Sequence, residues 1–286
     1  MFPRLSPRAL YNTAPRPFHR PSPALVRNMT TPTPVWKPDA SYERRDMPPR
    51  DAGEPSSGPT AGQVDAYLAP KLLHPSYGAD PALPAIQSRA LEAGIPPISV
   101  SPLQGQFLSI LALSIGAERI LEVGTLAGYS TAFLSKALPG HGQIDTLELD
   151  PHHAAVAQEN FLNADLFPFP TIHVGPALET LKRLEKPAEG AYDLVFIDAD
   201  KEGTLGYVKE GLRLLRKGGV VVVDNAVRSG RIALSREEEP SPNVDGMRRL
   251  YDWIEQDGGR TVLANVTQTV GAKSWDGFAI LYKLVE

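Results

Sequence analysis

The chain has 286 residues, of which 42% are hydrophobic and 22% charged, and its formal net charge is −4 at pH 7. This composition fits one sizeable globular domain with an appendage, and the slight negative charge predicts neither nucleic acid nor a membrane surface as a partner. No apolar stretch approaches the roughly 18 to 20 residues of a membrane span, and the absence of cysteine excludes disulfides, thiol nucleophiles and thiolate metal sites.

Residues 1–60 are predicted to form a basic, proline-rich leader and linker with no packed core. The first acidic residue is Asp39, whereas six arginines and lysines precede it. An acid-free basic segment is typical of organellar transit peptides and also of plain basic tails, so we expect a mitochondrial or a cytoplasmic protein. Met29 offers a second start that would give a shorter cytosolic form. Residues 39–60 lack periodicity and are expected to be a linker.

Residues 61–286 are predicted to form a single α/β domain. Helical patterns begin near Gln63, at Ala82 and at Ser101, where Pro102 takes the first helical position. From Arg119 onward, short apolar runs alternate with longer helical patterns. The expected strands are 120–123, 143–149, 171–174, 194–197, 220–223, 260–266 and 277–284, and the expected helices between them are 128–137, 151–163, 176–185, 202–216 and 244–256. The first five strands, separated by helices, predict right-handed crossovers and a mostly parallel sheet covered on both faces.

A pair of glycines marks the turn after the first predicted strand. Gly124 and Gly128 would let the backbone turn sharply and approach a ligand closely. Glu148 lies twenty residues further on, at the end of the second strand, where an acid suits hydrogen bonding to ribose hydroxyls. Asp150 is then expected to cap the next helix. The turn therefore predicts a nucleoside site, although a purely structural turn with an exposed acid has the same pattern.

The spacing of this turn separates several classes of ligand. G-x-x-x-G differs from the G-x-G-x-x-G of dinucleotide enzymes, and no Lys-Ser or Lys-Thr follows, as it would in a P-loop. Glu122, just before the turn, could receive the ammonium of an amino-acid moiety, which a dinucleotide lacks. The residues thus favour a nucleoside that carries an amino acid.

Two buried strands end in acidic residues. Asp198 and Asp200 follow one strand, and Asp224 with Asn225 ends another. Because ligands of open α/β sheets bind beyond the carboxyl ends of the strands, neighbouring strands would bring Asp198, Asp224 and Asn225 together. Oxygen ligands without cysteine or convergent histidine suit a hard divalent cation, Mg²⁺ first, with Ca²⁺ or Mn²⁺ as alternatives. The competing interpretation is that these acids only cap helices and turns.

At these residues the chain resembles the cation-dependent class I O-methyltransferases, the family that holds caffeoyl-CoA and catechol O-methyltransferases. The resemblance runs from about Gln63 to Glu286. It is strongest in the segments Gly105–Leu108, Leu121–Ser130, Gly175–Leu178, Tyr192–Lys201 and Val223–Asn225. The glycine turn alone would mark only the methyltransferase superfamily, whereas the combination is specific.

The resemblance implies a Rossmann-like α/β fold, in which helices cover both faces of a seven-stranded, mostly parallel sheet with a reversed last strand. It also implies a homodimer, since the plant branch is usually dimeric. Lys201 would be the catalytic base, acting beside Asp198. The metal would be held by Asp198, Asp224 and Asn225. The S-adenosylmethionine site would be formed by Ile98, Val100, Glu122, Gly124, Ser130, Glu148, Ala177, Asp198, Asp200 and Tyr207.

Two positions depart from the family pattern. Gln104 stands just before Gly105, where the family often has an acid, and Arg228 stands three residues after the metal asparagine, where plant enzymes carry an aromatic. That aromatic helps to hold the acceptor ring. Arg228 is therefore expected to contact the substrate and to favour acceptors with a carboxylate or a phosphate.

The sequence thus predicts a divalent-cation-dependent O-methyltransferase that moves the methyl of S-adenosylmethionine to a catechol-like or other vicinal-diol acceptor, or to an acyl-CoA thioester that carries one. Two alternatives stay open at this point. A dinucleotide-binding oxidoreductase is disfavoured by the glycine spacing and by Glu122. A non-catalytic S-adenosylmethionine-binding protein is disfavoured by the intact set of Asp198, Lys201, Asp224 and Asn225.

Overall fold

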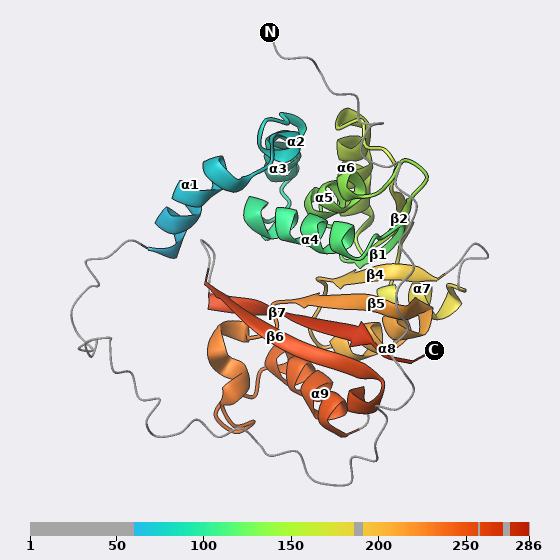
Figure 1. Ribbon diagram of the computed structural model, residues 1–286. Helices are drawn as coiled ribbons and strands as arrows, with labels where there is room; N and C mark the ends of the chain where they lie inside the picture. The colour runs from blue at the N-terminus through green and yellow to red at the C-terminus, as the bar shows by residue number, and fades with distance from the viewer. Residues whose placement is uncertain (1–59, 186–190, 257, 271–274, 286) are drawn as a thin grey trace. The chain divides into compact units, whose positions relative to one another are not determined.

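The computed structural model describes residues 60–185, 191–256, 258–270 and 275–285, all of which belong to the unit Ser56–Glu286 (Figure 1). The predicted leader and linker, with the alternative start at Met29, lies outside the described residues except for Thr60. The hydroxyl of Thr60 accepts the backbone N–H of Gln63, and the Gln63 side chain accepts the backbone N–H of Thr60 in return. This capping box starts the first helix of the domain.

Seven strands form one sheet in the order β3-β2-β1-β4-β5-β7-β6. The strands are β1 (Arg119–Val123), β2 (Gln143–Glu148), β3 (Thr171–Val174), β4 (Tyr192–Ile197), β5 (Leu215–Asp224), β6 (Val262–Val270) and β7 (Trp275–Lys283). The first five pair in parallel, and β7 pairs antiparallel to both β5 and β6. The predicted Rossmann-like class I methyltransferase sheet, with its reversed last strand, is confirmed.

Nine α-helices and two 3₁₀ turns are present in the described residues. They are α1 (Ala61–Leu72), α2 (Pro75–Gly78), α3 (Ala82–Glu92), α4 (Pro102–Ser114), α5 (Tyr129–Ala137), α6 (Pro151–Asn163), α7 (Ala177–Arg183), α8 (Thr204–Leu214), η4 (Arg228–Ala233), α9 (Pro242–Gln256) and η5 (Gly258–Arg260). All the helices predicted from periodicity occur within a few residues of their expected bounds. The short elements α2, η4 and η5 were not predicted.

The boundary between α8 and β5 differs from the prediction. The apolar pattern suggested a helix as far as residue 216, but α8 ends at Leu214 and β5 already begins at Leu215. Leu215 pairs with Tyr192 of β4, and a register shift follows before Val220 pairs with Leu194. The strand therefore takes these residues because pairing partners on β4 are available, which a local pattern does not reveal.

The strand residues divide between two cores, one on each face of the sheet. On one face, α3, α4, α5 and α6 cover Ile120, Phe196 and Val222, with Phe133 and Phe161 among the fully buried side chains. On the other, α7, α8 and α9 cover residues such as Leu121, Val195 and Val221. Figure 1 shows these two helix layers above and below the strands. Alternate residues of β1, β4 and β5 are thus buried on both sides, which explains their nearly continuous apolar sequences.

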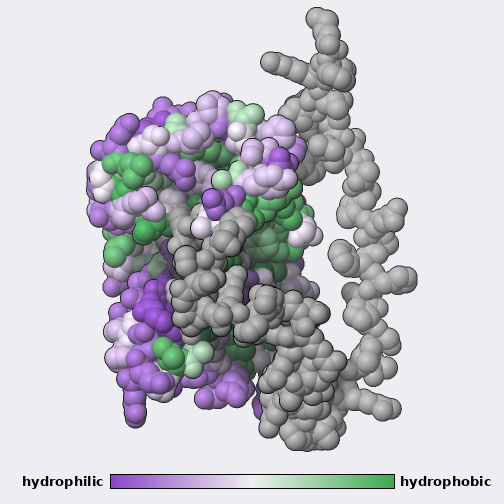
Figure 2. All heavy atoms as spheres, turned by 90° about the vertical axis from the view of Figure 1, so that its left-hand side faces the viewer, coloured by the Kyte–Doolittle hydropathy of each residue, from purple (hydrophilic) through white to green (hydrophobic). Residues whose placement is uncertain are grey.

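The helix α1 packs less tightly than the other helices. None of its residues is buried, and Val64 and Tyr67 are among the exposed large apolar side chains of the described chain. Figure 2 shows the face on the α1 side, where hydrophobic areas alternate with hydrophilic ones. None of the helices in the described ranges is long and apolar enough to cross a membrane.

The helix α9 approaches the backbone after β4 at a position that only glycine fits. A Cβ on Gly246 would lie 2.0 Å from the carbonyl oxygen of Lys201. We expect Gly246→Ala to lower the free energy of unfolding by about 1 to 3 kcal/mol, because rigid backbone must move to admit the methyl group. Chemical denaturation measures this change.

The matched control is Gly206→Ala in the first turn of α8. There a Cβ would lie 3.2 Å from the end of the flexible Leu178 side chain, so the helical preference for alanine should offset the contact and leave stability within about 1 kcal/mol. Equal stability of the two variants would contradict the close approach of α9.

Candidate functional site

The carboxyl ends of the parallel strands open into two adjoining cavities. The larger, of about 700 Å³, extends from the ends of β2 and β1 to that of β4 and to Arg228 beyond β5. The smaller, of about 440 Å³, lies between α4, the end of β5 and the β6–β7 pair. Both are lined by Ile98, Ser99, Val100 and Asn225. The two cavities therefore form one continuous candidate site.

The predicted glycine turn connects β1 to α5 and forms part of the larger cavity. Gly124 has φ +104°, and a Cβ there would lie 2.1 Å from the carbonyl oxygen of Asp198. Gly128 has φ +84°, and a Cβ there would meet the Phe161 ring at 2.2 Å. Both glycines are thus required by the backbone conformation and by close contacts, so the sharp turn is confirmed.

Glu148 lines the larger cavity at the end of β2, as predicted. One carboxylate oxygen accepts the backbone N–H of Leu126 at 2.7 Å, and the other accepts that of Asp150 at 3.0 Å. These bonds fix the carboxylate and leave lone pairs for a ligand in the cavity. Asp150 caps α6 by accepting the N–H of His152 at 2.7 Å, which confirms its predicted role.

Glu122 is fully buried behind the glycine turn. Its carboxylate accepts hydrogen bonds from the hydroxyls of Ser130 at 2.6 Å, Thr131 at 2.5 Å and Thr146 at 2.6 Å. Burial raises its pKa to about 7, against the opposing effect of these three donors. Ser130 lines the larger cavity, whereas Glu122 is not among its lining residues. A direct contact between Glu122 and the ammonium of a cofactor stays a prediction.

The acids of β4 and β5 meet at the junction of the two cavities. Asp198 lines the larger cavity and Asp224 the smaller, with Asn225 in both. The ammonium of Lys201, whose side chain is only 8% exposed, lies 3.0 Å from Asp198 Oδ1. Burial, and then the charge of Asp198, raises the pKa of Asp224, while Lys201 opposes the shift. The predicted convergence of these four side chains is therefore observed.

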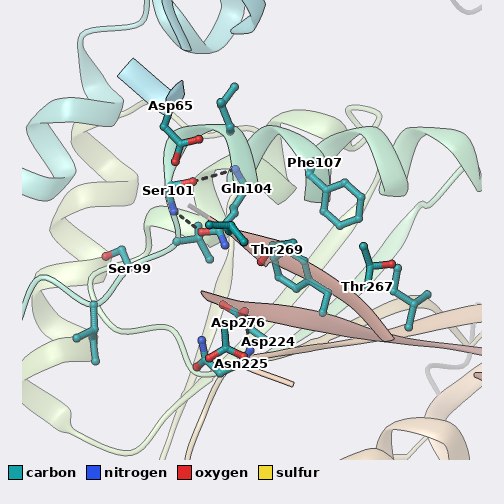
Figure 3. A pocket seen from close by; sticks show the side chains of 16 residues that line it. Asp65, Ser99, Ser101, Gln104, Phe107, Asp224, Asn225, Thr267, Thr269 and Asp276 are labelled. Carbon is teal, nitrogen blue, oxygen red and sulfur yellow. Dashed lines mark hydrogen bonds between the residues drawn. The ribbon is translucent and has the colours of Figure 1, made fainter. Parts of the chain in front are cut away.

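This cluster fits a hard divalent cation. Asp198, Asp224 and Asn225 offer carboxylate and amide oxygens, the ligands that Mg²⁺, Ca²⁺ and Mn²⁺ prefer. Two carboxylates share one ammonium, so the cluster carries a net negative charge that a cation would neutralise. Across the described ranges no group of three or more histidine, cysteine or acidic side chains is arranged for a metal. Figure 3 shows Asp224 and Asn225 side by side at one end of the smaller cavity.

Asp200 and Tyr207 also line the larger cavity. The Tyr207 hydroxyl donates to Asp200 Oδ1, and Asp200 Oδ2 accepts the N–H of Gly203 at 2.8 Å. The pKa of Tyr207 is raised by burial and by this hydrogen bond to a carboxylate. Asp200 thus orders the start of α8 and faces the cavity at the same time. The remaining predicted cofactor residues, Ile98, Val100 and Ala177, line the same cavity.

Most of the smaller cavity was not predicted from the sequence. Its wall joins the N-terminal helices to the last two strands, and among its residues are Asp65, Ser101, Gln104, Phe107, Thr267, Thr269, Asp276 and Phe278 (Figure 3). Of these residues, only Gln104 stands out in the sequence as a departure from the family pattern. Its side-chain oxygen accepts the N–H of Ser101 at 2.8 Å within the capping box of α4. Residues so far apart in sequence meet only through the sheet topology.

Arg228 lines the larger cavity and not the smaller one. Its backbone is left-handed, with φ 53°, and its N–H donates to Asp276 Oδ1 at 3.0 Å, next to the N–H of Val227 at 2.8 Å. The side chain of β7 residue Asp276 therefore holds the chain after β5 in place. The predicted substrate residue is positioned on the same cavity as Asp198 and Lys201.

Comparison with known proteins agrees with this geometry. The sequence pattern of the O-methyltransferase family matches residues 76–269. A catechol O-methyltransferase from Niastella koreensis is 44% identical over 218 residues, which cover 76% of this chain and 95% of that protein. Another from Mycobacterium tuberculosis is 43% identical over 222 residues, covering 78% of this chain and 96% of that protein.

Among solved structures, an O-methyltransferase from Bacillus cereus in complex with SAH superposes with a TM-score of 0.72 at 36% identity, covering 78% of this chain and 98% of that chain. The fold and the site define a class I methyltransferase. The chain belongs to the O-methyltransferase family and is an enzyme of that family. This assignment displaces both the dinucleotide oxidoreductase and the non-catalytic protein.

The buried carboxyl of Glu122 predicts a pH-dependent stability. Its pKa is raised in the folded state, so the unfolded chain ionises first as the pH rises from 4.5 towards 7, and the free energy of unfolding falls over that interval. In Glu122→Gln the side chain does not ionise, so the free energy of unfolding does not fall for this reason. Between pH 5 and 8 we expect the variant to gain on the order of 2 kcal/mol of stability relative to wild type. Urea denaturation at a series of pH values measures the difference.

The control is Glu92→Gln on the exposed surface of α3. Its stability should follow that of wild type at every pH. A constant difference between Glu122→Gln and wild type from pH 5 to 8 would mean that Glu122 ionises normally in the fold.

Proposed function

We propose that this protein transfers the methyl group of S-adenosylmethionine to one hydroxyl of a catechol-like or other vicinal-diol acceptor, and that a divalent cation is required. The observation that carries the proposal is the meeting of Asp198, Asp224 and Asn225 with Lys201 where the two cavities join. The relatives named catechol O-methyltransferase, and the SAH-bound structural neighbour, support the acceptor and the cofactor.

The larger cavity would hold the cofactor. Glu148 is positioned at one end to accept hydrogen bonds from ribose hydroxyls, while Gly124 lets the backbone approach closely. The methyl group would then point towards Asp198 and Asn225, beside the smaller cavity. Two features support this placement, since ribose hydroxyls need a fixed acceptor and a close backbone approach needs glycine.

The acceptor would be held at the junction by its two adjacent oxygens. Asp198, Asp224 and Asn225 would bind the cation, which when bound supplies a Lewis acid that lowers the hydroxyl pKa and fixes its distance. Lys201 Nζ would take the hydroxyl proton as a neutral amine, after it has released its own proton to water. The oxygen then forms a bond to the methyl carbon while the carbon–sulfur bond breaks, leaving S-adenosylhomocysteine. Because the methyl group is already electrophilic, positioning and deprotonation are the protein's main contributions.

A homodimer is also proposed. Apolar side chains of α4 and of the β6–β7 pair remain exposed in the described chain, namely Ile110, Leu113, Leu263 and Tyr282. A second copy covering this surface would remove apolar area from water. Light scattering after size exclusion should give twice the chain mass, and a monomeric mass would reject the proposal.

The acceptor chemistry can be tested by comparing catechol with phenol. Chelation needs two adjacent oxygens, so catechol should be methylated with a kcat/KM at least about 10³-fold above that of phenol. EDTA should abolish the reaction, and excess Mg²⁺ should restore it. Release of S-adenosylhomocysteine measures all three rates. Equal rates on the two acceptors that are indifferent to EDTA would exclude the chelation mechanism while leaving methyl transfer itself intact.

Two substitutions should separate the metal end of the site from the cofactor end. Asp224→Asn keeps the side-chain shape but removes a charge, so we expect methyl transfer to be lost while the Kd of S-adenosylmethionine stays within about tenfold. Glu148→Gln should weaken cofactor binding by about 1 to 3 kcal/mol, because ribose hydroxyls lose a charged partner. Isothermal titration calorimetry and turnover rates distinguish the two effects. Equal loss of cofactor affinity in both variants would show that the two ends are wrongly assigned.

A further inference from the structure

Arg228 lies at the opposite end of the larger cavity from the proposed ribose site. Along the edge of the sheet the order is β2, β1, β4 and β5, so Glu148 at the end of β2 is three strand spacings, about 14 Å, from the end of β5. Arg228 follows β5 by four residues and lines the same cavity. Asp198, at the end of β4, falls between the two ends, whereas Asn225 directly follows β5. The topology thus puts Arg228 near the proposed metal ligand Asn225 and away from Glu148.

The guanidinium of Arg228 makes no hydrogen bond or ion pair with the residues that the structure describes. Its Nε is buried and makes no hydrogen bond, and no carboxylate in the described part of the chain forms an ion pair with it. A buried N–H of a charged group that makes no hydrogen bond lowers the free energy of unfolding by more than most single contacts raise it. The two Nη atoms of Arg228 are not among the buried atoms without a partner and form no hydrogen bond with the described residues, so they can donate to an anion in the cavity.

The backbone that carries Arg228 is fixed from two sides. Asp276, which Figure 3 shows beside Asp224 and Asn225, holds the Arg228 N–H at 3.0 Å. The buried Arg248 of α9 donates to the carbonyls of Arg231 at 3.0 Å and Leu234 at 2.6 Å, further along the same segment. The segment is thus anchored before and after the turn, and Arg228 keeps its left-handed backbone despite being neither glycine nor asparagine.

A second donor reaches the same end of the cavity. Asn243, the second residue of the 15-residue helix α9, is exposed and lines the larger cavity with Arg228. Its amide can donate to an oxygen, and the positive end of α9 lies beside it. Lys201 is the other cationic residue of this cavity, but its ammonium is already paired with Asp198. Arg228 therefore supplies the positive charge that remains free for a ligand.

We propose that Arg228, assisted by Asn243, binds a carboxylate on the acceptor, so that the enzyme selects anionic vicinal diols over neutral ones; this inference rests on the proposed function. The guanidinium presents two parallel N–H donors that match a carboxylate. With the diol held by the cation that Asp198, Asp224 and Asn225 would bind, and the acid held by Arg228, the acceptor is fixed at two points. Two fixed points orient the reacting oxygen better than chelation alone.

The experiment compares 3,4-dihydroxybenzoate with its neutral amide, 3,4-dihydroxybenzamide. The two share the diol and the ring and differ in charge at one position. Wild type, Arg228→Gln, Arg228→Lys and the control Arg236→Gln are assayed with Mg²⁺. Arg236 belongs to the same segment and pairs with Asp245 and Asp252 on the surface, so its substitution removes the same charge without touching either cavity. The Kd of S-adenosylhomocysteine, and that of each diol in its presence, is measured by calorimetry.

We expect kcat/KM for the acid to exceed that for the amide by about tenfold or more in wild type, as a charge-assisted hydrogen bond predicts. Arg228→Gln should reduce this ratio to near one, Arg228→Lys should retain part of it, and Arg236→Gln should retain all of it. The Kd of the acid should weaken in parallel in Arg228→Gln, while the Kd of S-adenosylhomocysteine stays within about threefold.

Three outcomes would overturn the inference or separate it from the proposed function. A ratio that Arg228→Gln leaves unchanged rejects the role of Arg228 in the acceptor site. An equal loss of S-adenosylhomocysteine affinity reassigns the guanidinium to the cofactor and rejects the inference too. If neither diol is methylated but the acid still binds in an Arg228-dependent way, the anion site stands and the proposed reaction fails.

Discussion

The parallel register of β4 and β5 brings two carboxylates close together at the edge of the sheet. Ile197 pairs with Val223, so the residues that follow, Asp198 and Asp224, lie side by side, with Asp224 still paired to Phe278 of β7. Two like charges at this separation repel each other, and burial of Asp224 makes its ionised form still less favourable. One lysine ammonium compensates part of this repulsion. A further positive charge at that point would lower the remaining repulsion, as the proposed cation would.

The acids along this edge differ in environment, and each environment suits a different task. Glu122 is enclosed by three hydroxyl donors with a pKa near neutrality, so it orders Ser130 and α5 from behind. Glu148 is held by two backbone N–H groups and keeps a free face towards the cavity. Asp198 forms an ion pair with Lys201. The same chemical group therefore acts as a structural anchor, a ligand acceptor or a charged site according to its neighbours.

Much of the fold and of the chemical centre could be predicted because the signals are local. Alternating apolar runs and helical patterns fixed the order of the strands and helices, and the acids at strand ends needed only the parallel topology to bring them together. Predictions failed where residues far apart in the sequence determine the local structure. Leu215 joins β5 because Tyr192 is there to pair with it, and the walls of the smaller cavity, such as Asp65, Phe107 and Thr267, come from opposite ends of the chain. The lack of a partner for Arg228 Nε is likewise a property of the packed structure and leaves no trace in the sequence.

The residues that local sequence patterns predicted are those proposed to carry the chemistry. The residues that only the folded structure brings together are those proposed to determine which acceptor is bound. The groups proposed to handle the cofactor and the proton stand at the ends of β1, β2, β4 and β5, where the central sheet holds them rigidly. The groups proposed to surround the acceptor stand on α1, α4, the chain after β5 and the β6–β7 pair. Of these, α1 and η4 have no buried residue, so they can change without disturbing the sheet. Arg228 illustrates the point, because its backbone is fixed by Asp276 while its side chain has no hydrogen-bond or ion-pair partner among the described residues. A substitution there can change which acceptor is bound and leave the geometry of Asp198, Lys201 and Asp224 intact.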